Sequence, residues 1–111
     1  MDTQINKKEI TAKGIRFTAI LGDKKVGRSY LYLMHNDLHQ RPFALVEDVF
    51  VDEQCRGQGV GSKLVKEMIK EAKNRDCYKI IMTSRYSKPR VHSLYLKLGF
   101  EDWGKEFRME M

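Results

Sequence analysis

The sequence predicts one α+β domain with a mixed, mostly antiparallel sheet and helices on its faces, in the order strand, strand, strand, helix, strand, helix, strand. Strand-like apolar runs occupy residues 15–51, two segments with helical spacing follow, and a short apolar run separates those segments. A chain of 111 residues is long enough for a single hydrophobic core. We therefore expect one domain over residues 1–111, in which residues 1–14 form a flexible N-terminal extension.

The first half of the chain contains three predicted strands. Residues 15–21, IRFTAIL, alternate in polarity as a half-buried strand does, and residues 26–34, VGRSYLYLM, form a second, aromatic-rich run. The turn-forming sequence GDKK joins these runs, which predicts a hairpin. After a polar loop, FALVEDVFV at 43–51 is rich in valine and phenylalanine, so we expect a more central strand there.

A helix and a parallel strand are expected next. From residue 60 to about residue 75, apolar residues recur every three or four positions, and lysines and glutamates occupy the other side. Residues 77–84, CYKIIMTS, are a short apolar run that fits a buried strand. A right-handed crossover through the helix would place this strand parallel to residues 43–51.

The last quarter of the chain predicts a second helix and a final strand. Ser87 can cap a helix whose first turn contains Pro89, and Gly99 supplies the left-handed residue that ends it. Residues 100–111, FEDWGKEFRMEM, then alternate in polarity and predict a terminal strand.

Composition favours a cytoplasmic protein without a membrane segment. The apolar runs are only a few residues long, and the first residues lack the apolar core of a signal peptide. Cys55 and Cys77 have no partner at metal-binding spacing, so neither a disulfide nor a metal site is expected. The formal net charge of +6 would suit a polyanionic partner, but interspersed acidic residues fit a solvated surface equally well.

Three glycines lie between the third strand and the first helix, in the stretch DEQCRGQGVGSKL at 52–64. A helix N-terminus presents free N–H groups, and glycines allow phosphate oxygens to approach the backbone. Arg56 adds a planar guanidinium that matches a diphosphate. The residue order Gly-Ser-Lys excludes a P-loop, and the GxGxG spacing excludes a dinucleotide fingerprint. A glycine-rich turn without a ligand is the alternative.

The stretch VFVDEQCRGQGVGSKLV, together with LYLKLGF at 94–100, resembles the GNAT superfamily of N-acetyltransferases. The matching positions are Arg56, Gly59 and Gly61 in one family motif and Leu94, Tyr95, Gly99 and Phe100 in the other. The resemblance implies that the protein binds acetyl-coenzyme A (acetyl-CoA) and moves its acetyl group directly to a primary amine in a ternary complex. It also implies a GNAT-like sheet whose two central parallel strands splay apart, in a chain that lacks the family's usual N-terminal strand and helix pair.

Coenzyme contacts follow from the resemblance, residue by residue. Main-chain amides of the glycine loop would hold the diphosphate, the backbone of the third strand would pair with the pantetheine arm, and an N–H of that strand would polarise the acetyl carbonyl. The residues implied are Val49, Phe50, Val51, Arg56, Gly57, Gln58, Gly59, Val60, Gly61 and Ser62. His92 is assigned to the same set, although an exposed helix histidine explains it as well.

Three residues are candidates for the acetyl transfer itself. Tyr95 has the apolar neighbours of a core tyrosine, but its position matches the proton donor of the family. Glu47 and Asp48 place two carboxylates in an apolar strand, where alternation predicts that they face opposite sides. Glu47 with a raised pKa would accept the ammonium proton, or would bind a cationic acceptor. An exposed pair at the rim of the sheet is the alternative.

The acceptor and the partners are less well defined. Asp48 and Arg85 join Glu47 as expected acceptor contacts, with solvated charge as the alternative for the basic stretch 84–90. The coenzyme half and the C-terminus look similar to glucosamine-6-phosphate N-acetyltransferases, which implies a homodimer that shares C-terminal strands. Without the usual N-terminal helices, the acceptor side would be open or completed by that second subunit. A non-catalytic coenzyme-binding module and an acetyltransferase or binder directed at nucleic acid are the rival functions.

Overall fold

The sheet of the protein has four strands in the order β1-β2-β3-β4, seen in a computed structural model that describes residues 2–111. β1 (Lys13–Leu21), β2 (Lys24–Met34) and β3 (Phe43–Val51) are antiparallel, and β4 (Ile80–Met82) pairs with β3 in parallel. The α+β class and the mixed, mostly antiparallel sheet are therefore confirmed. The first three strands also form where their alternating residues predict them.

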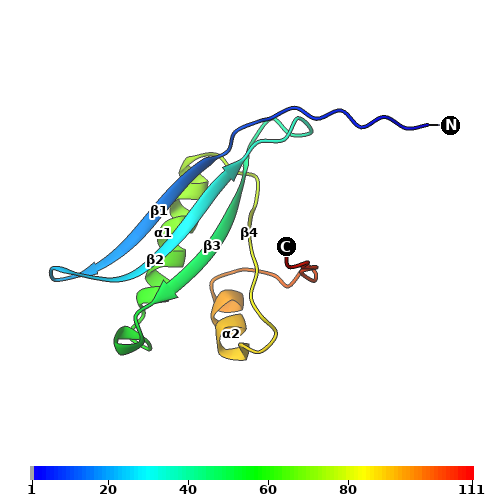
Figure 1. Ribbon diagram of the computed structural model, residues 1–111. Coiled ribbons are helices and arrows are strands. Elements are labelled where there is room, and N and C mark those ends of the chain that lie inside the picture. Colours follow the sequence, from blue (N-terminus) through cyan, green and yellow to red (C-terminus); the bar gives the residue numbers. More distant parts are fainter. Residues whose placement is uncertain (1) are drawn as a thin grey trace.

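One helix supplies most of the core. α1 (Val60–Asn74) follows β3, lies against one face of β1, β2 and β3, and leads to β4 (Figure 1). Its apolar side packs against the buried side of the sheet, and the shared core consists of Leu31, Ala44, Val46, Val65, Met68 and Ala72. α2 (Pro89–Lys97) lies beyond the end of β4 (Figure 1). Neither helix in residues 2–111 has the length and hydropathy needed to cross a membrane.

A β-bulge interrupts β3 in its middle. Arg28 pairs with Phe50 and Tyr30 pairs with Glu47, so two residues of β3 lie opposite the single residue Ser29 of β2. Asp48, one of the two, has a φ of 52°, which is uncommon for a residue other than glycine. The bulge shifts the alternation of β3 by one residue.

Pairing between β3 and β4 stops just before this bulge. The last of three matched pairs joins Val46 to Met82, and the predicted strand over 77–84 is therefore shortened to Ile80–Met82. Beyond this point β3 continues to Val51 while the chain after β4 moves away towards α2 (Figure 1). The expected splay of the two parallel strands is thus present, and the bulge accounts for it.

Two local predictions for the last quarter of the chain were wrong. The residue that precedes α2 is Lys88 rather than Ser87, and no side chain caps the helix, although Pro89 is in its first turn as predicted. The predicted strand over 100–111 does not form: residues 101–111 are irregular and exposed. A strand needs a partner for its backbone groups, and alternation alone does not provide one.

Candidate active site

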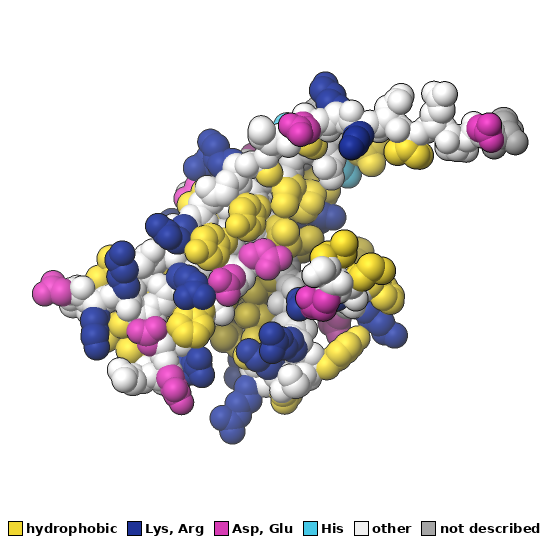
Figure 2. All heavy atoms as spheres, in the orientation of Figure 1, with side chains coloured by type: hydrophobic (Ala, Val, Ile, Leu, Met, Phe, Trp, Pro, Cys, Tyr) yellow, Lys and Arg dark blue, Asp and Glu magenta, His cyan; other side chains and the backbone are white. Residues whose placement is uncertain are grey.

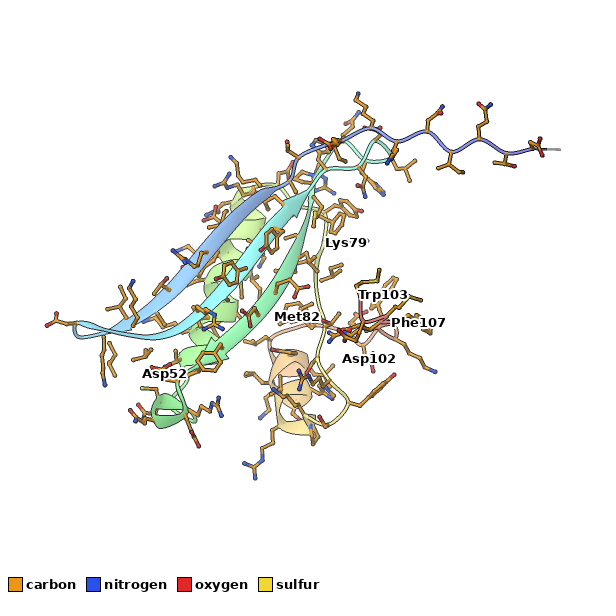
Figure 3. The ribbon with its side chains drawn as sticks, viewed as in Figure 1. Asp52, Lys79, Met82, Asp102, Trp103 and Phe107 are labelled. Atoms are coloured by element: carbon orange, nitrogen blue, oxygen red, sulfur yellow. The ribbon has the colours of Figure 1, made fainter. Side chains whose placement is uncertain are left out.

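A cleft of about 710 Å³ lies where β3 and β4 separate. Its walls come from β3, the start of α1, the segment after β4, one side of α2 and part of the C-terminal segment. The side chains that define its chemistry are Glu47, Asp48, Arg56, Arg85, Lys88, Tyr95, Glu106 and Arg108. Two strands, β3 and β4, border this cleft. In Figure 3 the label Asp52 marks the residue just after β3, and the label Met82 marks the last residue of β4.

The glycine turn between β3 and α1 forms one end of the site. A short 3-10 helix (Glu53–Cys55) follows β3, and Gly57 and Gly59 then adopt left-handed φ values of 79° and 85°. A side chain at either position would meet no atom within 4 Å, so glycine is needed for the backbone conformation and the space outside is open. Gly59 is the N-cap residue that precedes α1, and it provides no side-chain hydrogen bond to the helix.

Free N–H groups accompany this turn. The N–H of Lys63 donates to the carbonyl of Gly59 at 3.0 Å, and the N–H groups of the residues before Lys63 lie in the first turn of α1, where a helix offers no internal acceptor. These N–H groups lie at the N-terminus of α1, the end of the helix that carries a partial positive charge. The turn therefore has the features of an anion-binding site, as the sequence predicts.

Arg56 links the turn to the end of β3. Its Nε donates a hydrogen bond to the carbonyl of Val51 at 3.0 Å, and its guanidinium carbon lies 5.7 Å from the centre of the Phe50 ring. These contacts leave the terminal nitrogens of Arg56 free of ion pairs within residues 2–111. A guanidinium fixed in this way at the cleft wall can bind an anion with little loss of side-chain entropy.

Glu47 and Asp48 both face the cleft, which corrects the prediction that they point to opposite sides. Val46 is buried against α1 and Val49 packs against the same core, whereas the two carboxylates between them are exposed. The bulge explains this, because its extra residue carries Asp48 to the face that Glu47 already occupies. Both carboxylates are exposed, as the alternative interpretation of the sequence expects. They line the cleft, however, instead of lying apart from it.

The two carboxylates differ in their partners. Asp48 accepts from Arg28 at 3.3 Å, and the Arg28 guanidinium also lies 4.7 Å from the centre of the Phe50 ring. Glu47 has no ion pair in the described part of the chain. Glu47 is therefore the free anion of the cleft. The sequence gives no signal for the part played by Arg28, because its partner is 20 residues away along the chain.

Tyr95 projects from α2 into the cleft while part of its ring packs against the core. The ring centres of Tyr95 and Phe100 are 6.0 Å apart, so the two aromatic residues of the second family motif are in contact. Burial raises the pKa of the Tyr95 hydroxyl. Tyr95 therefore keeps its proton at neutral pH and can donate it. The two interpretations of the sequence, a core tyrosine and a proton donor, are compatible in this position.

Basic side chains gather on the α2 side of the cleft. Arg85 and Lys88 line it from the loop after β4 and have no ion pairs within residues 2–111. Arg108 lines it from the C-terminal segment, where its Nε lies 2.7 Å from Glu106. Figure 2 shows such basic groups beside acidic ones around the centre of the molecule. Arg108 was not foreseen, since the sequence predicted a strand in that segment.

Not every predicted contact residue lines the cleft. Val49, Phe50, Val51, Arg56 and Gly61 do, whereas the neighbouring turn and helix residues Gly57, Gln58, Gly59, Val60 and Ser62 adjoin it. His92 lies outside the lining, and its Nε2 donates to the carbonyl of Arg85 at 2.7 Å. His92 therefore secures the loop that presents Arg85. Residues 2–111 contain no group of three or more His, Cys, Asp or Glu residues arranged for a metal ion.

Comparison with known proteins gives consistent matches. The model of the Acetyltransferase (GNAT) family matches residues 2–100. Glucosamine 6-phosphate N-acetyltransferase 1 of Oryza sativa subsp. japonica is 40% identical over 55 residues, which are 50% of this chain and 32% of that protein. Thialysine N-epsilon-acetyltransferase of Bos taurus is 31% identical over 77 residues, 69% of this chain and 45% of that protein.

Solved structures show the same arrangement. A putative acetyltransferase from Agrobacterium tumefaciens str. C58 superposes with a TM-score of 0.82 at 29% identity, over 88% of this chain and 69% of that chain. The chain spans only a third to less than half of the length of the two curated relatives named above.

Proposed function

Because the chain belongs to the GNAT acetyltransferase family, we propose that it is an N-acetyltransferase that moves an acetyl group from acetyl-CoA directly to a primary amine. One observation carries the proposal: the cleft at the splayed end of β3 and β4 brings together Arg56 of the glycine turn, Tyr95 and Glu47. These residues are far apart in the sequence and have the anion-binding, acidic and basic character that acetyl transfer requires.

The coenzyme would be held at the glycine turn. The first-turn N–H groups of α1 and the guanidinium of Arg56 suit its diphosphate, and open space at Gly59 allows that group to approach the backbone. Arg85 and Lys88 add unpaired positive charge on the opposite wall for further phosphate. The edge of β3 beyond Val46, which β4 leaves unpaired, offers backbone groups to the pantetheine arm.

Two side chains would assist the transfer, one as a base and the other as an acid. Acetyl-CoA, when bound, supplies an acetyl thioester, so that a C–N bond forms to the amine and the C–S bond breaks. The Glu47 carboxylate takes a proton from the ammonium group of the acceptor, which frees the nitrogen lone pair. The Tyr95 hydroxyl gives its proton to the departing sulfur, and the second proton that the nitrogen loses as the amide forms restores this hydroxyl. The raised pKa of Tyr95 keeps the hydroxyl protonated before the transfer.

We also propose that the protein acts as a homodimer through its C-terminal segment. Phe107 and Met109 are 92% and 82% exposed, whereas the alternating Glu106 and Arg108 line the cleft. Figure 3 shows Trp103 and Phe107 on the side of β4 that faces away from β3. Exposed apolar side chains of this kind, beside the outer edge of β4, suit contact with a second copy of the chain.

Calorimetric titration with acetyl-CoA and an assay of thiol release with simple amines test the function. We expect micromolar coenzyme binding and amine-dependent thiol release by the native chain, and loss of both in an Arg56→Ala, Gly59→Val double variant. Gly22→Val is the control for the glycine substitution, because Gly22 lies in the β1–β2 turn with a left-handed φ of 62° and open space around it. Arg56→Ala alone guards against misfolding at Gly59. Coenzyme binding without amine-dependent thiol release would contradict the proposal.

A further inference from the structure

The outer face of the sheet, away from α1, carries aromatic residues that the reaction above does not use. Ser29 and Leu31 are fully buried on the α1 side, so the intervening Tyr30 and Tyr32 project to the outer face, where both are half-buried. Tyr30 is the direct cross-strand partner of Glu47. Such partners have Cβ atoms about 4.5–5.5 Å apart. Tyr30 therefore stands beside the free carboxylate of the cleft.

The two tyrosine rings form one aromatic surface. Their planes are within 10° of parallel and their centres are 6.4 Å apart. Gly14 of β1 makes room for the second ring, because a Cβ at that position would lie 3.0 Å from Cε1 of Tyr32. On the other side of Tyr32 its cross-strand partner is Leu45. Figure 2 shows hydrophobic side chains directly beside acidic ones over this part of the sheet.

Charge on this face is distributed unevenly. Arg28 pairs with Asp48, which leaves Glu47 as the carboxylate without an ion pair next to the rings. A free carboxylate beside an aromatic surface suits a cation that is attached to a flat apolar group. The face of a tyrosine ring also attracts a cation directly, which adds to this preference.

We propose that the acceptor is a primary amine joined to an aromatic ring by an arm of two or three carbons. Its ammonium group lies at Glu47 and its ring lies on Tyr30 and Tyr32. Tyr30 is the direct and Tyr32 the diagonal cross-strand neighbour of Glu47, so a short arm can join an ammonium group at the carboxylate to a ring on the tyrosines. Tyr30 and Tyr32 do not line the cleft itself but adjoin it at Glu47, which does. This assignment rests on the proposed function, because it describes the acceptor whose amine reaches that cleft.

Steady-state acetylation of phenethylamine and of butylamine, at saturating acetyl-CoA, tests the assignment. The two amines differ in the ring, so the ratio of their kcat/KM values isolates its contribution. We expect phenethylamine to be favoured by about tenfold or more, the effect of an aromatic contact and the area it buries. Tyr30→Leu and Tyr32→Leu keep an apolar side chain and should each reduce that ratio through the KM of phenethylamine.

Tyr86→Leu is the matched control, because Tyr86 is 80% exposed and belongs to the loop between β4 and α2 instead of the outer face of the sheet. It should leave the ratio unchanged, and acetyl-CoA affinity should be equal in all variants. Equal use of both amines by the native chain, or a ratio unaffected by Tyr30→Leu and Tyr32→Leu, would overturn the assignment and leave the N-acetyltransferase function intact. Failure to acetylate either amine despite coenzyme binding would overturn both.

Discussion

Arg28 and Asp48 meet across the bulge of β3, with Nη2 of the arginine 3.3 Å from Oδ2 of the aspartate. Both side chains are largely exposed, so the ion pair itself contributes no more than about 1 kcal/mol to the free energy of unfolding. The backbone of Asp48 matters more, since its φ of 52° is tolerated by aspartate, asparagine and glycine. The residue type at position 48 therefore sustains the bulge that opens the cleft.

Asp48→Val should destabilise the fold by about 1–2 kcal/mol, because a β-branched residue is strained at this φ. Asp48→Asn removes the charge but tolerates the conformation, so it should cost less than half as much. Urea unfolding followed by circular dichroism measures both. Equal losses in the two variants would show that the ion pair, and not the backbone, sets the stability of the bulge.

Close packing of β2 against β3 and α1 gives a second prediction. A Cβ at Gly27 would lie 2.9 Å from the carbonyl oxygen of Phe50 and 3.3 Å from side chains of Val60 and Leu64. Gly27→Ala should therefore lower the free energy of unfolding by about 1–3 kcal/mol through overpacking. Gly104→Ala, where no atom lies within 4 Å, should change it little. A thermal melt of Gly27→Ala that matches the native chain would disprove the clash.

Local periodicity was sufficient to predict much of this fold. The β1–β2 hairpin and α1 form where alternation and helical spacing place them, because each buries a face that its own residues define. The glycine turn was also predictable, since left-handed positions favour glycine. The bulge was not, because VEDV contains no glycine or proline and the bulge is defined by pairing with β2. Consequently the shared orientation of Glu47 and Asp48 was missed.

The C-terminal segment shows the opposite failure. Its alternation indicates a strand, but residues 101–111 have no strand partner within the described residues 2–111, and strand formation depends on one. The position of Arg108 in the cleft could not be predicted for the same reason. Ser87 likewise has a good capping side chain, but α2 starts one residue later than a cap at this position requires. Such features depend on tertiary contacts that short sequence windows do not contain.

Tyr95→Phe removes the proposed proton donor and keeps the ring packing against Phe100. Turnover should fall by at least about tenfold while acetyl-CoA affinity is retained. Burial raises the pKa of Tyr95, so the donor form persists beyond its ordinary pKa near 10. Deprotonation of Tyr95 should therefore not lower the native rate until pH exceeds about 10. The variant has no hydroxyl at this position, so this fall in rate at high pH should be absent from it. Unchanged turnover in Tyr95→Phe would remove the residue from the chemistry.

Glu47→Gln tests the proposed base. A carboxamide cannot accept the ammonium proton, so the variant should lose about a hundredfold of kcat while it keeps its affinity for acetyl-CoA. Glu67→Gln, on the exposed side of α1, is the control and should keep the native kcat. A native kcat with a raised KM for the amine in Glu47→Gln would restrict the residue to binding the acceptor.

The exposed apolar residues of the C-terminal segment allow the dimer to be tested separately from the chemistry. Phe107→Ser with Met109→Ser removes two side chains that are exposed in the single chain, so the fold of the subunit should be unaffected. If a second copy buries them, the variant should sediment as a monomer at concentrations where the native chain is a dimer. Leu38→Ser, an equally exposed apolar residue of the β2–β3 loop, should leave the dimer intact. A native chain that sediments as a monomer at assay concentration and still acetylates amines would show that one subunit forms a complete site.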